Sequence, residues 1–247
     1  MSGEAFWLAA ILAATLVGLA KGGLPVVGML AVPVLALVIS PVAAAGLLLP
    51  VYVASDMIGL YAYRRAFDRR VLAILAPAAV LGIGLGWLTA AAVPERLVTG
   101  IVGAIGVAFA LSLILRLRPE GQGRRATLGP GLFWGAMTGY TSFVSHAGAP
   151  PYQVYVLPLK LEKTVFAGTT TVLFTFVNAV KLVPYWALGQ LSPANLQIAA
   201  VLALPAILAV LAGVRLVKVL PADLFFRLVT WALLAVSLKH LWSAVTG

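Results

Sequence analysis

The sequence has no cysteine, only two histidines and few charged residues, which make up 10% of the 247 positions. Without cysteine the chain has no thiolate metal site, no redox-active thiol and no covalent haem attachment. Two histidines are too few for a histidine metal cluster. We therefore expect no metal, no cofactor and no enzymatic activity. Soluble domains carry roughly 25% charged residues, and 62% of this chain is apolar, which excludes an ordinary water-soluble domain.

Long uncharged runs predict membrane-spanning helices, because a helix needs about 20 apolar residues to cross the bilayer. A closed barrel would instead show short segments of alternating hydrophobicity. Residues 71–93 and 97–115 contain no charge and are each long enough to cross. Four further spans are bounded by charged or turn-forming residues, at 42–63, 164–186, 194–214 and 222–243. The predicted fold class is all-α, a polytopic membrane protein with roughly eight to ten full or half-membrane helices.

Lysine and arginine outnumber aspartate and glutamate by 17 to 7, giving a net charge of +10. In a soluble protein this excess would suggest nucleic acid, but here the positive-inside rule explains it better, so no nucleic-acid partner is expected. The predicted location is the inner cell membrane, multi-pass, with both termini on the outer, periplasmic side. Three basic clusters are placed in the cytoplasm: Arg64, Arg65, Arg69 and Arg70; Arg116, Arg118, Arg124 and Arg125; and Arg215 with Lys218.

The sequence repeats itself at a nearly fixed interval. Lys21, Pro25 and Pro33 recur 125 positions later as His146, Pro150 and Pro158. Asp56 and Tyr63 match Asn178 and Tyr185 at an interval of 122. These matches predict a duplication, with residues 1–122 as the first membrane repeat and residues 123–247 as the second.

Each predicted repeat starts with two short apolar pieces separated by glycine and proline. They are 5–20 with 25–39 in the first copy, and 130–145 with 147–159 in the second. They are either shortened crossings or re-entrant hairpins, and both options give each copy an odd number of spans. The two repeats are therefore inverted relative to each other. Inverted repeats with interrupted helices are typical of secondary transporters, whose substrate site lies near the midplane.

The glycine-rich segments 18–28 and 142–150 resemble the repeats of the TauE/SafE sulfite exporter family. Residues 166–171, followed by Asn178 and Lys181, resemble the second-half helix of that family. The resemblance covers essentially the whole chain. It implies a permease, often an exporter, for sulfite, sulfonates or related small oxyanions.

The breaks in the two repeats hold the first candidate substrate residues. A buried charge costs several kcal/mol in a bilayer, so each one requires a reason. Lys21 and His146 occupy equivalent breaks, where unwound backbone and the positive ends of half-helices can hold an anion, and we expect them to flank it. Backbone amides at the glycines beside them can approach an oxyanion closely, and the prolines are predicted to begin helices; the alternative is close helix packing through small residues. These candidates are Gly22, Gly23, Pro25 and Gly148.

A second group of candidates lies near the predicted midplane. Asp56 and Asn178 each lie eight residues from the end of their span, about 12 Å inside the surface. Lys181 follows Asn178 by one turn on the same face, and its counterpart in the first repeat is Gly59. We expect Lys181 to supply positive potential for the substrate. Asp56 either pairs with a lysine or carries a coupling proton.

Hydroxyl and amide groups complete the candidate set. Tyr152 and Gln153 near the second break, and Thr169 and Thr170 in the following span, can donate hydrogen bonds to an oxyanion. The alternative for the threonines is a bond back to a carbonyl of their own helix.

These observations predict a secondary transporter that moves sulfite, an organosulfonate such as sulfoacetate, or a related oxyanion by alternating access, in the export direction. The expected partners are the small anion and the lipid bilayer; proton coupling and oligomerisation stay open. Two alternatives also stay open, namely a permease for a non-sulfur anion and a membrane assembly subunit that transports nothing.

Overall fold

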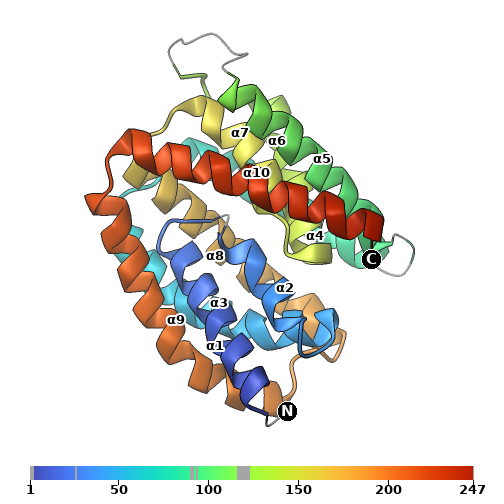
Figure 1. The fold of residues 1–247 in the computed structure, drawn as a ribbon. Helices are drawn as coiled ribbons and strands as arrows, with labels where there is room; N and C mark the ends of the chain where they lie inside the picture. The colour runs from blue at the N-terminus through green and yellow to red at the C-terminus, as the bar shows by residue number, and fades with distance from the viewer. Residues whose placement is uncertain (1–2, 26, 90–91, 93, 116–122, 247) are drawn as a thin grey trace. The chain divides into compact units, whose positions relative to one another are not determined.

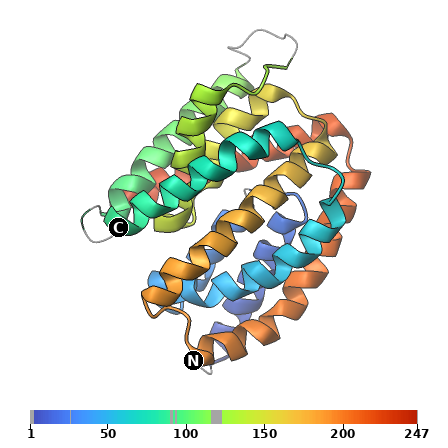
Figure 2. The same ribbon diagram turned by 180° about the vertical axis from the view of Figure 1, so that it is seen from behind.

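The computed structural model describes residues 3–25, 27–89, 92, 94–115 and 123–246 (Figures 1 and 2). Arg116 and Arg118 of the predicted second basic cluster lie outside the described residues. Within the described ranges the chain is helical and contains no strand. The elements are α1 (Glu4–Lys21), η1 (Val27–Leu30), α2 (Ala31–Leu35), α3 (Pro41–Tyr63), α4 (Arg69–Thr89), α5 (Glu95–Ile114), α6 (Leu128–Ser145), α7 (Ala149–Val156), η2 (Leu157–Leu159), α8 (Lys163–Ala187), α9 (Pro193–Val219) and α10 (Ala222–Thr246).

Six helices of the described chain are long and apolar enough to cross a membrane: α1, α3, α4, α8, α9 and α10. The apolar stretch of α5 is shorter, at Thr99–Ile114. These helices confirm the predicted all-α polytopic membrane class. The first piece of the first repeat is longer than predicted, because α1 has 18 residues and qualifies as a span by length and composition. The second pieces are short and broken, since α2 has five residues and α7 has eight.

The chain forms two compact units, each built from segments of both predicted repeats. The first unit contains Met1–Phe67 and Ala167–Leu220, and the second contains Asp68–Phe166 and Pro221–Gly247. In the first unit α9 packs along α1 and α3, while η1 and α2 pack against α1 (Figure 1). In the second unit α4 packs on α6, α5 packs on α10, and α7 contacts α5 and α6. Helices distant in sequence therefore become neighbours inside each unit.

Small residues bring the paired helices close together. A Cβ atom at Gly18 of α1 would lie 2.0 Å from the carbonyl oxygen of Ala206 in α9. In the second unit, a Cβ atom at Gly82 of α4 would lie 1.9 Å from the carbonyl oxygen of Ala136 in α6. Lipid provides no hydrophobic drive between membrane helices, so such close contact is a main source of their association.

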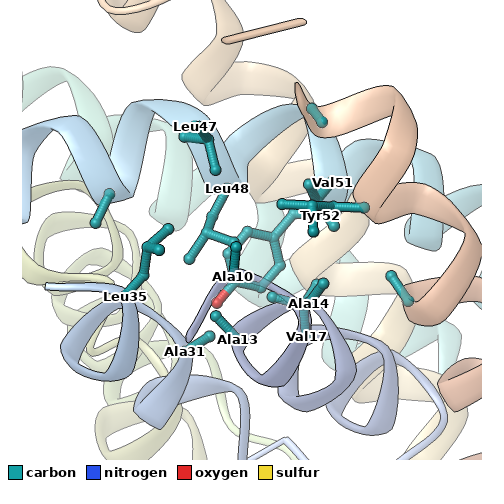
Figure 3. Packing of buried hydrophobic residues seen from close by; sticks show 14 of the residues in the cluster. Ala10, Ala13, Ala14, Val17, Ala31, Leu35, Leu47, Leu48, Val51 and Tyr52 are labelled. Carbon is teal, nitrogen blue, oxygen red and sulfur yellow. The ribbon is translucent and has the colours of Figure 1, made fainter. Parts of the chain in front are cut away.

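The core of the first unit is a cluster of alanine and branched aliphatic side chains (Figure 3). Ala10, Ala13 and Ala14 of α1 face Leu48 of α3 within this cluster, and the ring of Tyr52 extends from α3 into it. The Tyr52 hydroxyl donates a 2.9 Å hydrogen bond to the carbonyl of Gly28 in η1. This bond satisfies a buried polar group and fixes the short helices against α3.

Candidate functional site

The site begins where α1 ends. Lys21 is the last residue of α1, and Gly23 follows with φ of 117°, a backbone conformation that glycine adopts readily. The carbonyls at the helix end find partners on neighbouring helices: Thr171 Oγ1 donates to the Lys21 carbonyl at 3.1 Å, and the Tyr63 hydroxyl donates to the Gly22 carbonyl at 2.6 Å. The end of α1 is therefore anchored to both α3 and α8.

Gly59 makes this anchoring possible. A Cβ atom at Gly59 would lie 2.9 Å from the Lys21 carbonyl oxygen and 2.8 Å from Thr171 Cγ2. Any larger residue at this place in α3 would push α1 and α8 away. The absence of a side chain at position 59 thus has a packing reason.

Asp56 of α3 lies at the centre of the site. Its Oδ1 atom is 2.7 Å from Lys21 Nζ and 3.1 Å from Thr175 Oγ1, whose single hydroxyl proton is shared with the Thr171 carbonyl at 2.8 Å. Its Oδ2 atom accepts a 2.9 Å hydrogen bond from Asn178 Nδ2. Both side chains of the ion pair are buried, with 5% of Lys21 and 1% of Asp56 exposed. Asp56 therefore joins the end of α1 to α8 through three donors, and it has the lysine partner that was one of its two predicted options.

Two aromatic rings flank the ammonium of Lys21. Lys21 Nζ lies 5.4 Å from the centroid of the Tyr52 ring and 5.9 Å from that of Phe174. These distances suit cation–π attraction, which stabilises a cation removed from water. The ion pair and the rings together compensate the charge of Lys21.

Lys181 is a second buried cation in this region. It is one turn beyond Asn178 on α8, its side chain has no exposed surface, and its Nζ lies 5.5 Å from the centroid of the Tyr185 ring. It interacts electrostatically with both Lys21 and Asp56. Among the residues that the structure describes, these three are the only buried ones of the types Lys, Arg, Asp and Glu. We call Lys21, Asp56, Thr175, Asn178 and Lys181 the charged cluster.

The backbone amides of Gly22 and Gly23, which were predicted to approach the anion, make other hydrogen bonds in this structure. The Gly22 and Gly23 amides donate to the carbonyls of Gly18 and Ala20 at 2.9 and 3.1 Å. A Cβ atom at Gly22 would lie 2.6 Å from the Cα of Gly213 in α9. These contacts agree with the alternative prediction for these glycines, which was close helix packing through small residues. Pro25 lies in the turn before η1, whereas Pro150 lies at the start of α7 as predicted.

The remaining predicted residues divide between the units. Thr169 and Thr170 are buried in α8 of the first unit. The second unit holds His146, Gly148, Tyr152 and Gln153. His146 ends α6 in the left-handed conformation, with φ of 52°, and Gly148 precedes the first residue of α7. Within the first unit the structure thus brings together Lys21, Asp56, Asn178 and Lys181.

Gln153 stands out in the second unit. Its side chain is fully buried, and neither amide atom has a hydrogen-bond partner among the described residues. The same holds for Ser237 Oγ and His240 Nε2, which are one turn apart on α10. Buried polar atoms are rarely left without partners, so an unsatisfied amide is a candidate for contact with a ligand or water.

Sequence reasoning missed Thr175, Tyr52 and Phe174. Each had a usable signal: Thr175 lies one turn before Asn178, and Tyr52 one turn before Asp56. Phe174 follows Tyr52 by the same 122 positions that relate Asp56 to Asn178. The described residues contain no group of three His, Asp or Glu side chains that could hold a metal ion.

Comparison with known families identifies the chain. The family model for the sulfite exporter TauE/SafE matches residues 7–240, nearly its whole length. The chain belongs to the TauE/SafE sulfite exporter family. No curated protein and no solved structure matches it. The matched range includes every residue of the charged cluster, and the family assigns this TauE/SafE protein to the membrane transporters.

Proposed function

We infer that this TauE/SafE protein is a secondary transporter that binds sulfite, an organosulfonate or a related small oxyanion at the charged cluster, and moves it by alternating access in the export direction. One observation carries this inference: all buried Lys, Arg, Asp and Glu side chains of the described chain gather in one place, and they comprise two lysines and one aspartate. A cluster with a surplus of positive charge inside an apolar protein favours an anion.

The roles within the cluster follow from the contacts. Lys181 is assigned the principal anion contact, because it is a fully buried cation one turn beyond Asn178 on α8. Asn178 and Thr175 hold Asp56 in place from α8. Four further residues are assigned to the surroundings of this site: Thr169, Thr170, Gly22 and Gly23. The unsatisfied amide of Gln153, with His146, Gly148 and Tyr152, is proposed as a separate anion-contacting position within the second unit.

The predicted duplication favours the transporter mechanism. Among the described residues, the elements before residue 123 and those after it follow the same order: a long helix, a short broken piece and three long helices. Secondary transporters with inverted repeats expose one site alternately to the two sides of the membrane. If transport is coupled to protons, Asp56 is the group proposed to carry them, because it is the only buried carboxylate of the described residues.

The test is flux in proteoliposomes that contain only this protein. We expect exchange of internal and external sulfite in the wild type, and at least a tenfold lower rate, on the order of 1.4 kcal/mol, in Lys181→Gln. Lys218→Gln, the same change at an exposed position near the end of α9, serves as the control and should retain the wild-type rate. Absence of flux for every anion would favour a membrane assembly subunit that transports nothing. Flux of only non-sulfur anions would favour a permease for a non-sulfur anion.

A further inference from the structure

We propose that the charged cluster selects singly charged anions, and that Asp56 sets this preference by fixing the net charge of the site at +1. The proposal rests on the function inferred above and narrows its substrates to monoanions, such as hydrogen sulfite and sulfonates without a second acidic group. It assigns Asp56 a specificity role that is separate from proton coupling.

The charge count treats both lysines of the cluster as ammonium ions and Asp56 as a carboxylate. No other Lys, Arg, Asp or Glu side chain is buried in the described residues. Neighbouring groups are neutral: Thr175, Asn178 and the rings of Tyr52 and Phe174. A monoanion reduces the net charge of the cluster to zero, whereas a dianion leaves it at −1.

Donor groups from two helices surround Asp56. Its two oxygens lie against the ammonium of Lys21, the side-chain NH2 of Asn178 and the hydroxyl of Thr175. The carboxylate is held from α1 and α8 at once, so it stays beside the lysines. An uncompensated charge in an apolar interior is strongly unfavourable, so the surplus charge left by a dianion weakens its binding.

The experiment compares two probes that differ in one group. Isethionate carries one sulfonate and a neutral hydroxyl, and sulfoacetate carries the same sulfonate and a carboxylate. Apparent affinities are measured on the full-length purified protein by ligand-induced thermal stabilisation at neutral pH and constant ionic strength. We expect the wild type to prefer isethionate by about tenfold or more.

Four variants test whether the preference follows charge. Asp56→Asn raises the count to +2 and should shift the ratio of affinities toward sulfoacetate by about tenfold or more. Lys181→Met lowers the count to zero and should shift the ratio the other way. The double variant Lys21→Met/Asp56→Asn removes the ion pair but keeps the count at +1, so it should restore the wild-type ratio, even if both affinities fall. Thr175→Val removes one hydrogen bond to Asp56 without changing the charge and should also keep the ratio.

The outcomes separate this inference from the proposed function. Equal binding of the two probes by the wild type, or the wild-type ratio in both Asp56→Asn and Lys181→Met, would overturn the charge selection while leaving an anion carrier. If Asp56→Asn fails to fold, Lys181→Met and the double variant still decide the matter. Failure of sulfite, isethionate and sulfoacetate to stabilise the wild type would contradict the proposed function itself, and charge selection with it.

Discussion

Asp56 and Asn178 lie 122 positions apart in the chain and are joined by a 2.9 Å hydrogen bond between their side chains. They occupy matching places in the two predicted repeats. When two equivalent elements pack about a two-fold axis, equivalent residues meet each other only at the axis. The contact therefore supports a local pseudo-two-fold relation between α3 and α8. Tyr52 and Phe174 are separated by the same interval and contact the same lysine, which supports it further.

The Lys21–Asp56 pair should be more sensitive to the loss of one partner than to the loss of both. Lys21→Met or Asp56→Asn alone leaves a buried charge without its counterion, and each should destabilise the protein by about 3–5 kcal/mol. The double variant should lose much less. Thermal unfolding in detergent measures this, and additive losses in the double variant would show that the two side chains are energetically independent.

Gly18 and Gly84 should respond in opposite ways to alanine. A Cβ atom at Gly18 would lie 2.0 Å from the Ala206 carbonyl oxygen, so Gly18→Ala must separate α1 from α9, with a loss of about 1–3 kcal/mol. At Gly84, in the interior of α4, nothing lies within 4 Å of the added atom. Gly84→Ala should therefore stabilise the helix by up to about 1 kcal/mol. Equal unfolding temperatures for the two variants would contradict close packing at Gly18.

Glu162 should make the start of α8 dependent on pH. Burial tends to raise its pKa, but hydrogen bonds from the Thr164 and Val165 amides and from the Thr164 hydroxyl outweigh this and lower the pKa below the usual 4.5. Because the folded pKa is the lower one, the stabilisation is complete above the usual glutamate pKa and is lost as pH falls through the folded value.

Hydrogen exchange at the Thr164 and Val165 amides measures this effect. Protection should fall on acidification in the wild type and should be lower at neutral pH in Glu162→Ala, with a cost below about 1 kcal/mol because the side chain is largely exposed. Protection that stays unchanged in the variant would remove Glu162 as the cap of α8.

The predicted membrane orientation can be tested with single cysteines, because the chain has none of its own. Arg65, just beyond α3, belongs to a predicted cytoplasmic cluster. Leu188, just beyond α8, is separated from the predicted cytoplasmic residues Arg215 and Lys218 by the single predicted span 194–214, so we expect it on the outer side; both Arg65 and Leu188 are exposed. An impermeant thiol reagent added to intact cells should label Leu188→Cys and leave Arg65→Cys unlabelled until the cells are opened. The reverse pattern would invert the topology.

The sequence by itself determined the membrane class, the helical fold and the family of this protein. Composition and the length of the apolar runs decide these properties, because lipid admits only structures whose backbone hydrogen bonds are satisfied internally. Sequence also singled out Asp56, Asn178 and Lys181, since a charged or strongly polar side chain deep inside an apolar span is expensive and therefore conspicuous.

Only the tertiary structure decided which of these residues meet. Nothing in the sequence favours Lys21 over Lys181 as the partner of Asp56, because that choice depends on where the end of α1 packs between α3 and α8. It also could not show that Thr175, Tyr52 and Phe174 surround the ion pair. Contacts between segments more than 100 positions apart arise from helix packing, and packing depends on the fit of whole surfaces rather than on local patterns.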